Sequence, residues 1–234
     1  MSGREQILGR IRRALQVPAP HRHVLGDNEP ETKKEFAYAL PVLGTERRAW
    51  LPRVGESWDD QQALFSSNAA DLRAEFVLCA DLAELQTRLT SLAEECGWKR
   101  IAAHSGELAG YAAEMLSLPC LTTENGYEIS ELERCDAALT ECDALVAQTG
   151  SVLITSKSAG GRVISALTPH HVVLARRDQL VPDLTAAFML LKERYGERYP
   201  SLISFITGPS RTGDIERILV LGAHGPKRLT IFCV

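Results

Sequence analysis

Short apolar runs alternate with segments of helical periodicity along most of this sequence, and this alternation constrains the fold more than any other feature. Runs that fit short strands lie at 76–79, 99–103, 136–139, 144–147, 152–155, 171–175, 202–207 and 229–234. Helical segments are predicted at 57–73, 82–96, 183–195 and 214–221; the second has leucines at three- and four-residue steps, with Asp81 as N-cap and Gly97 at its end. The alternation predicts an α/β fold with a mainly parallel sheet flanked by helices.

The first 44 residues differ from the rest of the chain. Residues 2–5 (Ser-Gly-Arg-Glu) have the form of a capping box, and aliphatic residues follow at helical spacing as far as Leu15, which predicts an amphipathic helix over residues 3–16. Residues 17–34 hold three prolines and no periodicity, as a linker would. We therefore divide the chain into an N-terminal helix and linker (1–44) and an α/β domain (45–234). The helix packs either on its own domain or on a neighbouring chain, and the sequence leaves both open.

Charge and hydropathy argue against several classes of protein. The formal net charge of -4 and the sequence pI near 5.9 argue against a nucleic-acid binder, which usually carries a basic surface. No apolar run reaches the length of a membrane span, and the first fifteen residues lack the apolar core of a secretory signal. We expect a cytoplasmic protein that neither crosses a membrane nor binds nucleic acid.

The six cysteines do not form a recognisable ligand set. None belongs to a C-x-x-C pair, which is the usual unit of zinc-ribbon and iron–sulfur sites. We therefore expect no metal and no cofactor in this chain.

The segment 207–216 is the most informative for chemistry. A predicted strand runs into a Gly/Ser/Thr turn and then into a predicted helix, whose first amides are free to bind an anion. This predicts a small-anion site at the carboxyl edge of the sheet. In the alternative, the segment is a capped connector whose carboxylates complement the helix dipole and repel an anion. The candidate substrate-binding residues here are Gly208, Ser210, Arg211, Thr212, Asp214 and Glu216.

A second candidate segment spans residues 148–162. Thr149, Gly150 and Ser151 form a predicted tight turn between two strands, with Gly150 at a positive φ, and they are also candidate substrate-binding residues. The glycine-rich loop 156–162 carries Lys157 and Arg162. It either cradles a phosphate or carboxylate or is a flexible loop, since it matches neither the P-loop nor the dinucleotide-binding fingerprint.

Three histidines lie within or beside the predicted strands and helices. His170 and His171 are adjacent at the start of a predicted strand, so their side chains point to opposite faces, and we expect one to be buried and one to lie at the surface. His224 either reaches the same edge as Ser210, as a donor or general acid, or caps a helix. No nucleophile triad and no G-x-S-x-G motif is found, so the catalytic residues stay unassigned.

Three blocks of this sequence resemble the lactate utilization protein C family, whose members carry a LUD domain. The blocks are residues 208–216 (Gly-Pro-Ser-Arg-Thr-Gly-Asp-Ile-Glu) with 219–226 (Leu-Val-Leu-Gly-Ala-His-Gly-Pro), residues 148–153 (Gln-Thr-Gly-Ser-Val-Leu), and residues 7–15 (Ile-Leu-Gly-Arg-Ile-Arg-Arg-Ala-Leu). The resemblance spans nearly the whole chain. This chain departs from the family pattern at Gly213, usually Ala, and at Gln148, often Glu, which removes a carboxylate.

The resemblance implies a fold and a role. The fold would be similar to that of the sugar-phosphate isomerase and CoA-transferase superfamily. The role would be in oxidising L-lactate to pyruvate, together with two partner proteins that carry iron–sulfur clusters, and the ligand of this chain would be a small carboxylate. Whether the short subunit is itself catalytic is not implied.

Three functional hypotheses follow. The first is a subunit of a lactate-oxidising complex that serves substrate binding or assembly. The second is a free-standing enzyme of the sugar-phosphate isomerase or CoA-transferase type, with the two loops binding phosphate or CoA. The third is a regulatory ligand sensor with the N-terminal helix as its output.

Overall fold

The structure, a computed structural model, describes residues 51–124, 126–212, 220–221 and 225–234. Its helices are α2 (Trp58–Asp71), α3 (Leu82–Cys96), α4 (Glu107–Leu116), α5 (Ile129–Leu132), α6 (Ile164–Leu167) and α7 (Leu184–Tyr195), with a short 3-10 turn at Arg177–Gln179. The predicted N-terminal helix and the 44/45 boundary lie outside the described residues.

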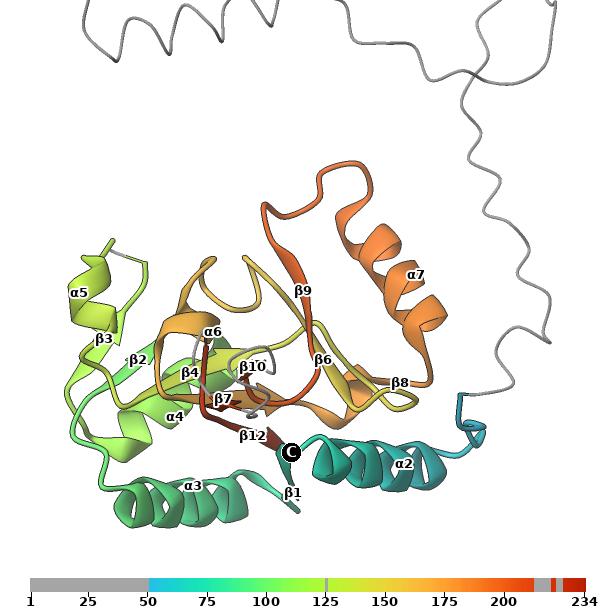
Figure 1. Ribbon diagram of the computed structural model, residues 1–234, viewed down its shortest axis with the longest axis horizontal. Coiled ribbons are helices and arrows are strands. Elements are labelled where there is room, and N and C mark those ends of the chain that lie inside the picture. Colours follow the sequence, from blue (N-terminus) through green and yellow to red (C-terminus); the bar gives the residue numbers. More distant parts are fainter. Residues whose placement is uncertain (1–50, 125, 213–219, 222–224) are drawn as a thin grey trace, which may run out of the picture. The chain divides into compact units, whose positions relative to one another are not determined.

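Six parallel strands form the main sheet (Figure 1). They are β1 (Glu75–Leu78), β2 (Ile101–Ala103), β3 (Cys120–Thr122), β4 (Ala137–Glu141), β7 (His170–Ala175) and β12 (Arg228–Cys233). Their order is β1-β12-β7-β4-β2-β3, and every pairing is parallel. The predicted α/β fold with a mainly parallel sheet is therefore confirmed. The central strands β4 and β7 are almost entirely buried, as expected for a sheet covered on both faces.

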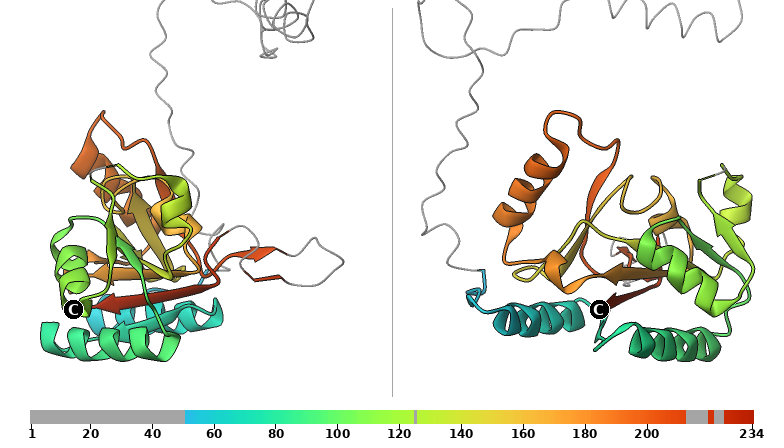
Figure 2. Two further views of the ribbon diagram at one scale, coloured as in Figure 1. Left: turned by 90° about the vertical axis from the view of Figure 1, so that its left-hand side faces the viewer. Right: turned by 180° about the vertical axis from the view of Figure 1, so that it is seen from behind.

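A second sheet has four strands in the order β8-β5-β6-β9. They are β5 (Ala144–Val146), β6 (Ser151–Thr155), β8 (Leu180–Val181) and β9 (Ile203–Ile206). β6 is antiparallel to both β5 and β9, and β8 is parallel to β5. A two-stranded ribbon, β10 (Arg211–Thr212) with β11 (Val220–Leu221), projects from the body of the domain (Figure 2).

Successive side chains of each strand point to opposite faces of the sheet, and this divides the core into layers. On β7, Val172 and Leu174 pack with leucines of α3 and α4, whereas Val173 and Ala175 face a cluster that includes residues of α2 and of the second sheet. A third cluster joins the outer face of the second sheet to α7. The main sheet therefore lies between the α3/α4 layer and the second sheet, and this places polar residues of β4, β7 and β9 close together.

Capping residues explain where the long helices begin and end. The Asp81 side chain accepts a hydrogen bond from the Glu84 amide (2.9 Å), and Gly97 closes α3 in the left-handed conformation, both as predicted. Asp183 caps α7 in the same way through the Ala186 amide (2.8 Å). The helices α3 and α7 and the strands β1 and β2 match their predicted ranges to within two residues.

Two parts of the prediction need correction. The helix predicted over 214–221 is wrong at its end, because Val220 and Leu221 pair as β11 with β10. Short aliphatic runs fit either a strand or a helix, and here strand pairing decides; residues 214–219 lie outside the described residues. The helix α4 and the strand β3 were not predicted; both are short, with ten and three residues.

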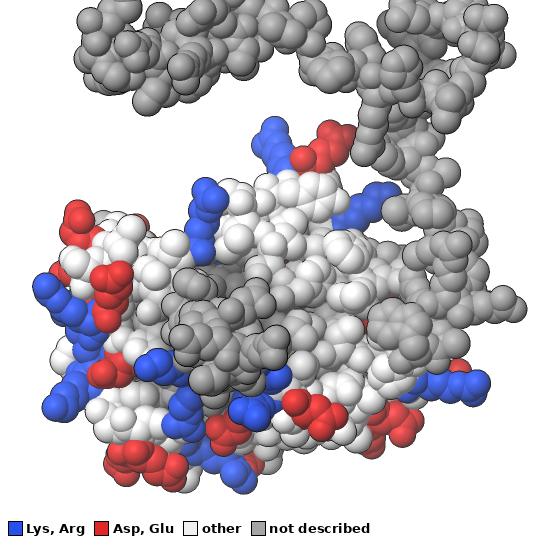
Figure 3. Space-filling model, viewed as in Figure 1, with Lys and Arg blue, Asp and Glu red and all other residues white. Residues whose placement is uncertain are grey.

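Acidic and basic side chains are interspersed over the face of the domain shown in Figure 3. The described part of the chain has no helix long and apolar enough to span a membrane.

Candidate functional site

A cavity of about 200 Å³ lies between the two sheets, next to the segment that the sequence singled out. It is lined by β9 (Ser204, Ile206), β7 and β12 (His171, Leu229), α6 (Ser165, Ala166) and the loops 208–210 and 225–226. Sites for drug-sized ligands are usually larger, about 300–1,000 Å³. The cavity therefore suits a ligand of only a few non-hydrogen atoms.

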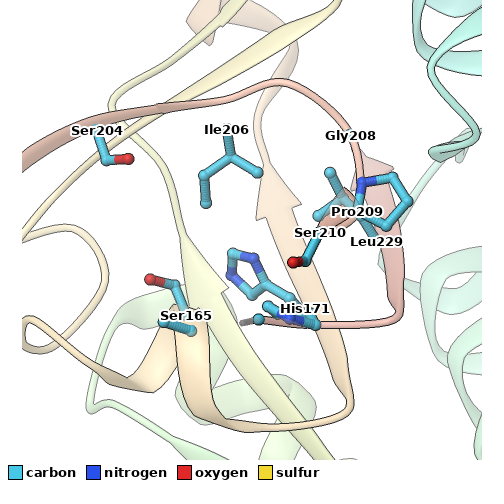
Figure 4. A pocket seen from close by; sticks show the side chains of 11 residues that line it. Ser165, His171, Ser204, Ile206, Gly208, Pro209, Ser210 and Leu229 are labelled. Atoms are coloured by element: carbon cyan, nitrogen blue, oxygen red, sulfur yellow. The ribbon is translucent and has the colours of Figure 1, made fainter. Parts of the chain in front are cut away.

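The imidazole of His171 is the central polar group of the cavity (Figure 4). The residue is completely buried, and its Nε2 lies 2.8 Å from Oγ1 of Thr140 on the neighbouring strand β4. Its Nδ1 is buried without a hydrogen-bond partner among the described residues. Burial, together with the smaller effect of nearby His170, lowers the pKa of His171 from 6.5 to about 3. The ring is therefore neutral at physiological pH.

Three serine hydroxyls accompany this ring. In Figure 4 the ring lies between the side chains of Ser165 and Ser210, and Ser204 lines the cavity beside Ile206. No hydrogen bond joins these hydroxyls to another described residue. The Ser210 amide donates to the Pro226 carbonyl (2.9 Å), which holds the two lining loops together.

His170 occupies the opposite face of the sheet. Its Nε2 lies 2.9 Å from Oγ1 of Thr230, and its ring meets that of Trp98 edge-on, with centroids 5.2 Å apart. Burial lowers its pKa from 6.5 to about 4, with help from Arg228. Opposite faces are confirmed, but the expectation that one histidine lies at the surface is wrong. Both are buried because both faces of β7 are covered.

Gly208 and Arg211 both meet the carboxyl end of α2. A Cβ at Gly208 would lie 2.6 Å from the Leu72 carbonyl oxygen, so this position needs glycine. The Arg211 guanidinium donates to the same carbonyl and is exposed. Because α2 has no basic residue in its last turn, Arg211 supplies the cation that a helix carboxyl end favours. Gly208 lines the cavity, and Arg211 is not among the residues that line it.

The turn at 148–151 supports the site without lining it. Gly150 has a φ of 63°, as predicted, and packs against Asn68 of α2, whose side-chain amide donates to the Ala147 and Gln148 carbonyls. The turn is therefore fixed on α2 and does not reach the cavity.

Ser151, which follows Gly150, connects this turn to the end of β9. The Ser151 hydroxyl lies 2.8 Å from that of Thr207, the residue before Gly208, so the segments 148–162 and 207–216 are in contact here. Thr149 Oγ1 is buried without a partner among the described residues. Of the predicted site residues that the structure describes, Gly208 and Ser210 line the cavity, whereas Thr149, Gly150 and Ser151 do not.

The remaining predicted residues are only partly described. Thr212 belongs to β10, where its backbone pairs with Val220. Asp214, Glu216 and His224 lie outside the described residues.

The glycine-rich loop 156–162 is held by its own hydrogen bonds. Thr155 Oγ1 accepts from the amides of Lys157 and Ser158, each at 3.2 Å. The Lys157 ammonium lies 5.2 Å from the centroid of the Tyr195 ring, a cation–π contact. Arg162 is exposed. This arrangement gives Lys157 a partner within the domain.

The position of the cavity differs in part from the prediction. It lies at the carboxyl end of β9, as expected, but at the amino ends of β7 and β12 in the parallel sheet. The reason is that residues 207–210 return from the second sheet toward the start of β12.

Ser165, Ser204 and His171 line the cavity but were not predicted as site residues from the sequence. A signal existed for Ser204, since alternation along β9 places it on the same face as Ile206, two residues before Gly208. Ser165 lies in a four-residue helix with no such signal.

The chemistry available is hydrogen bonding by neutral groups. A neutral imidazole donates from one ring nitrogen and accepts at the other, and each serine hydroxyl does both. Apolar side chains of Ile206 and Leu229 form part of the wall. Among the described residues, no cluster of three or more His, Cys, Asp or Glu could hold a metal ion.

Comparison with known proteins gives a family. The LUD domain family model matches residues 63–234, which is more than half of the chain. Lactate utilization protein C of Halalkalibacterium halodurans is 37% identical over 108 residues, covering 45% of this chain and 47% of that protein. The protein of the same name from Anoxybacillus flavithermus is 37% identical over 106 residues, with the same coverage. The matched part of the chain thus spans about half the length of these curated relatives.

One solved structure shares the fold. The crystal structure of a DUF162 family protein from Deinococcus radiodurans aligns with a TM-score of 0.59 over 77% of this chain and 99% of that chain. The two sequences are 22% identical, so this similarity speaks for the fold alone.

Proposed function

We propose that this chain, which belongs to the LUD domain family, serves lactate utilization in the cytoplasm by binding a small carboxylate in the His171 cavity. The ligand is L-lactate or its oxidation product pyruvate. The matched family and the names of the relatives support the process. The cavity supports the ligand class.

The observation that carries the proposal is the set of polar groups around His171. A carboxylate accepts about four hydrogen bonds at its two oxygens. The three serine hydroxyls and the imidazole offer four groups within a cavity of about 200 Å³. Because the ring is neutral, the carboxylate would be held by hydrogen bonds and not by an ion pair with His171. Hydrogen bonds to a charged group are the stronger kind, worth about 1.5–3 kcal/mol each.

The reaction needs more than this cavity. Oxidation of L-lactate to pyruvate removes two electrons and two protons from the substrate. In our proposal, two partner proteins with iron–sulfur clusters accept the electrons, and this chain binds and orients the carboxylate. The chain is then a component of a lactate-oxidising complex.

Calorimetric titration of the full chain tests the binding step. L-lactate and pyruvate should bind, and lactamide, which keeps the shape but loses the charge, should bind more weakly. Ser165→Ala should weaken L-lactate binding by about tenfold or more, because it removes one donor to the carboxylate. Ser91→Ala is the matched control, since Ser91 lies on α3 and its side chain bonds, among the described residues, only to the Thr87 carbonyl. No heat of binding with either acid, together with a thermal shift by sugar phosphates or CoA esters, would overturn the proposal.

Growth of a deletion strain tests the process. Loss of growth on L-lactate but not on glucose, restored by the gene, is the expected result. Affinity purification from lactate-grown cells should then recover iron–sulfur proteins with this chain. Recovery of the chain alone would contradict the proposed complex.

A further inference from the structure

We infer that Thr140 holds His171 as the Nδ1–H tautomer, so that the cavity presents an N–H donor and selects a ligand with an acceptor oxygen at that position. The inference rests on the proposed function for the ligand's identity, and it goes further by naming the atom that the ligand meets. A carboxylate or keto oxygen fits, whereas an amine does not.

The hydrogen bonds of Thr140 fix the tautomer. Thr140 is completely buried, and its hydroxyl carries one hydrogen. Among the described residues, its only hydrogen-bond partner is Nε2 of His171, at 2.8 Å. Either assignment leaves one donor hydrogen without a protein partner: that of the Thr140 hydroxyl if Nε2 is protonated, or that of Nδ1 if it is not. Thr140 is not among the residues that line the cavity, whereas His171 is, so only the ring nitrogen can be satisfied by a ligand there. The hydroxyl therefore donates to Nε2, which carries the lone pair.

The proton of the neutral ring then resides on Nδ1. A neutral imidazole has one protonated nitrogen, so an accepting Nε2 implies Nδ1–H. Nδ1 is buried and has no partner among the described residues, which makes it an unsatisfied donor. A ligand oxygen in the cavity would satisfy it, and a ligand ammonium would not.

The adjacent histidine has the opposite assignment. Thr230 Oγ1 lies 3.1 Å from Oε2 of Glu75, and an ionised carboxylate only accepts, so Thr230 donates there. The Thr230 hydroxyl hydrogen is thereby used, and Nε2 of His170, 2.9 Å away, must be the donor. His170 is therefore the Nε2–H tautomer. One chain thus holds two buried histidines with opposite tautomers and so contains its own internal reference.

The imidazole of His171 determines which class of ligand fits, because the serine hydroxyls can adapt to either a donor or an acceptor. Hydroxyl groups rotate to donate or accept as a ligand requires. The His171 ring cannot adapt in this way, because Thr140 fixes its protonation. Thr140 is a positioning residue in this scheme and does not touch the ligand itself.

Nitrogen-15 NMR of the full chain labelled at histidine tests the inference, because the two neutral tautomers have distinct ring-nitrogen shifts. His171 should give the Nδ1–H pattern and His170 the Nε2–H pattern. Addition of pyruvate should shift the His171 Nδ1 signal and leave His170 unchanged. Thr140→Val should abolish the fixed tautomer and weaken pyruvate binding by about tenfold, the effect of about 1.4 kcal/mol. Thr140→Ser should restore both.

The outcomes separate this inference from the proposed function. An Nε2–H pattern for His171 in the unmodified chain overturns the inference even if pyruvate binds, and the proposed function survives. An Nδ1–H pattern that neither L-lactate nor pyruvate perturbs supports the tautomer and overturns the proposed function. The unmodified chain decides both points, so the result does not depend on whether Thr140→Val folds.

Discussion

Nε2 of His171 lies 2.8 Å from the hydroxyl oxygen of Thr140, and both side chains are completely buried. This contact joins two central strands of the parallel sheet beneath the cavity. In our proposal it connects the stability of the domain to the chemistry of the site, since Thr140 both packs in the sheet and fixes the ring nitrogen that the ligand would meet.

Acid should destabilise the domain through its buried histidines. The pKa of His170 is lowered to about 4 and that of His171 to about 3, chiefly by burial. Below the unfolded pKa of 6.5, the unfolded chain binds more protons than the folded chain, so stability falls as pH falls toward the folded values. Each histidine should cost about 1.4 kcal/mol per pH unit, or about 2 kcal/mol between pH 6.5 and 5.

Urea denaturation between pH 7.5 and 5 measures this effect. His104, whose pKa is also lowered by burial, acts in the same direction. Glu84 and Glu124 have lowered pKa values as well, but they lose their contribution only below the ordinary value of 4.5, so the window above pH 5 reports on histidine. Equal stability at pH 5 and pH 7 would show that the histidines are not buried as described.

Gly150→Ala should destabilise the domain more than Gly97→Ala. Both glycines have nearly the same positive φ, 63° and 65°, so both variants meet the same backbone cost of about 1–2 kcal/mol. A Cβ at Gly150 would also lie 2.8 Å from Asn68 Cβ and 2.9 Å from the Ala69 amide nitrogen, whereas a Cβ at Gly97 meets nothing within 4 Å. The difference should be about 1–3 kcal/mol in urea denaturation. Equal losses would mean that the turn is not packed on α2.

Arg194→Ala should destabilise the attachment of α7. The fully buried Asp143 accepts from the Arg194 guanidinium (2.8 Å) and from the Tyr195 hydroxyl (2.6 Å), and its other oxygen has no partner among the described residues. Removing the cation leaves a buried charge, at a cost of about 3 kcal/mol, the low end for buried pairs because Arg194 is half exposed.

Arg198→Ala is the control for this variant. Arg198 is exposed, and among the described residues its side chain has no hydrogen bond or ion pair. Its loss should change the free energy of unfolding by less than about 0.5 kcal/mol. A similar effect for both variants would reduce the role of Arg194 to general surface charge.

Much of the fold could be predicted because local rules and burial agree. The leucine spacing of α3, its Asp81 cap and its Gly97 end are each readable on their own. Residues 172–175 of β7 are apolar at every position and buried on both faces, which is typical of a parallel sheet. In contrast, Val220 and Leu221 form a strand because β10 lies beside them, and no local pattern reports that partner.

The site was harder to predict because its residues are distant in sequence. Gly208 and Ser210 were found from their turn chemistry, and both line the cavity. Arg211 has the chemistry of an anion ligand, yet it faces Leu72, because a helix end 139 residues earlier lies within its reach. For His170 and His171, the alternation of side chains along a strand predicted one buried and one surface histidine. Both are buried, because packed layers cover both faces of the sheet, and this is not readable from the local sequence.

A comparison of Ser210→Ala with Arg211→Ala, by calorimetric titration with L-lactate, tests the central claim most directly. Ser210 lines the His171 cavity, whereas Arg211 donates to the Leu72 carbonyl. We predict that Ser210→Ala weakens binding by about tenfold or more, and that Arg211→Ala leaves affinity unchanged while lowering stability by about 1 kcal/mol. Loss of binding in Arg211→Ala with full binding in Ser210→Ala would place the carboxylate elsewhere and contradict the account.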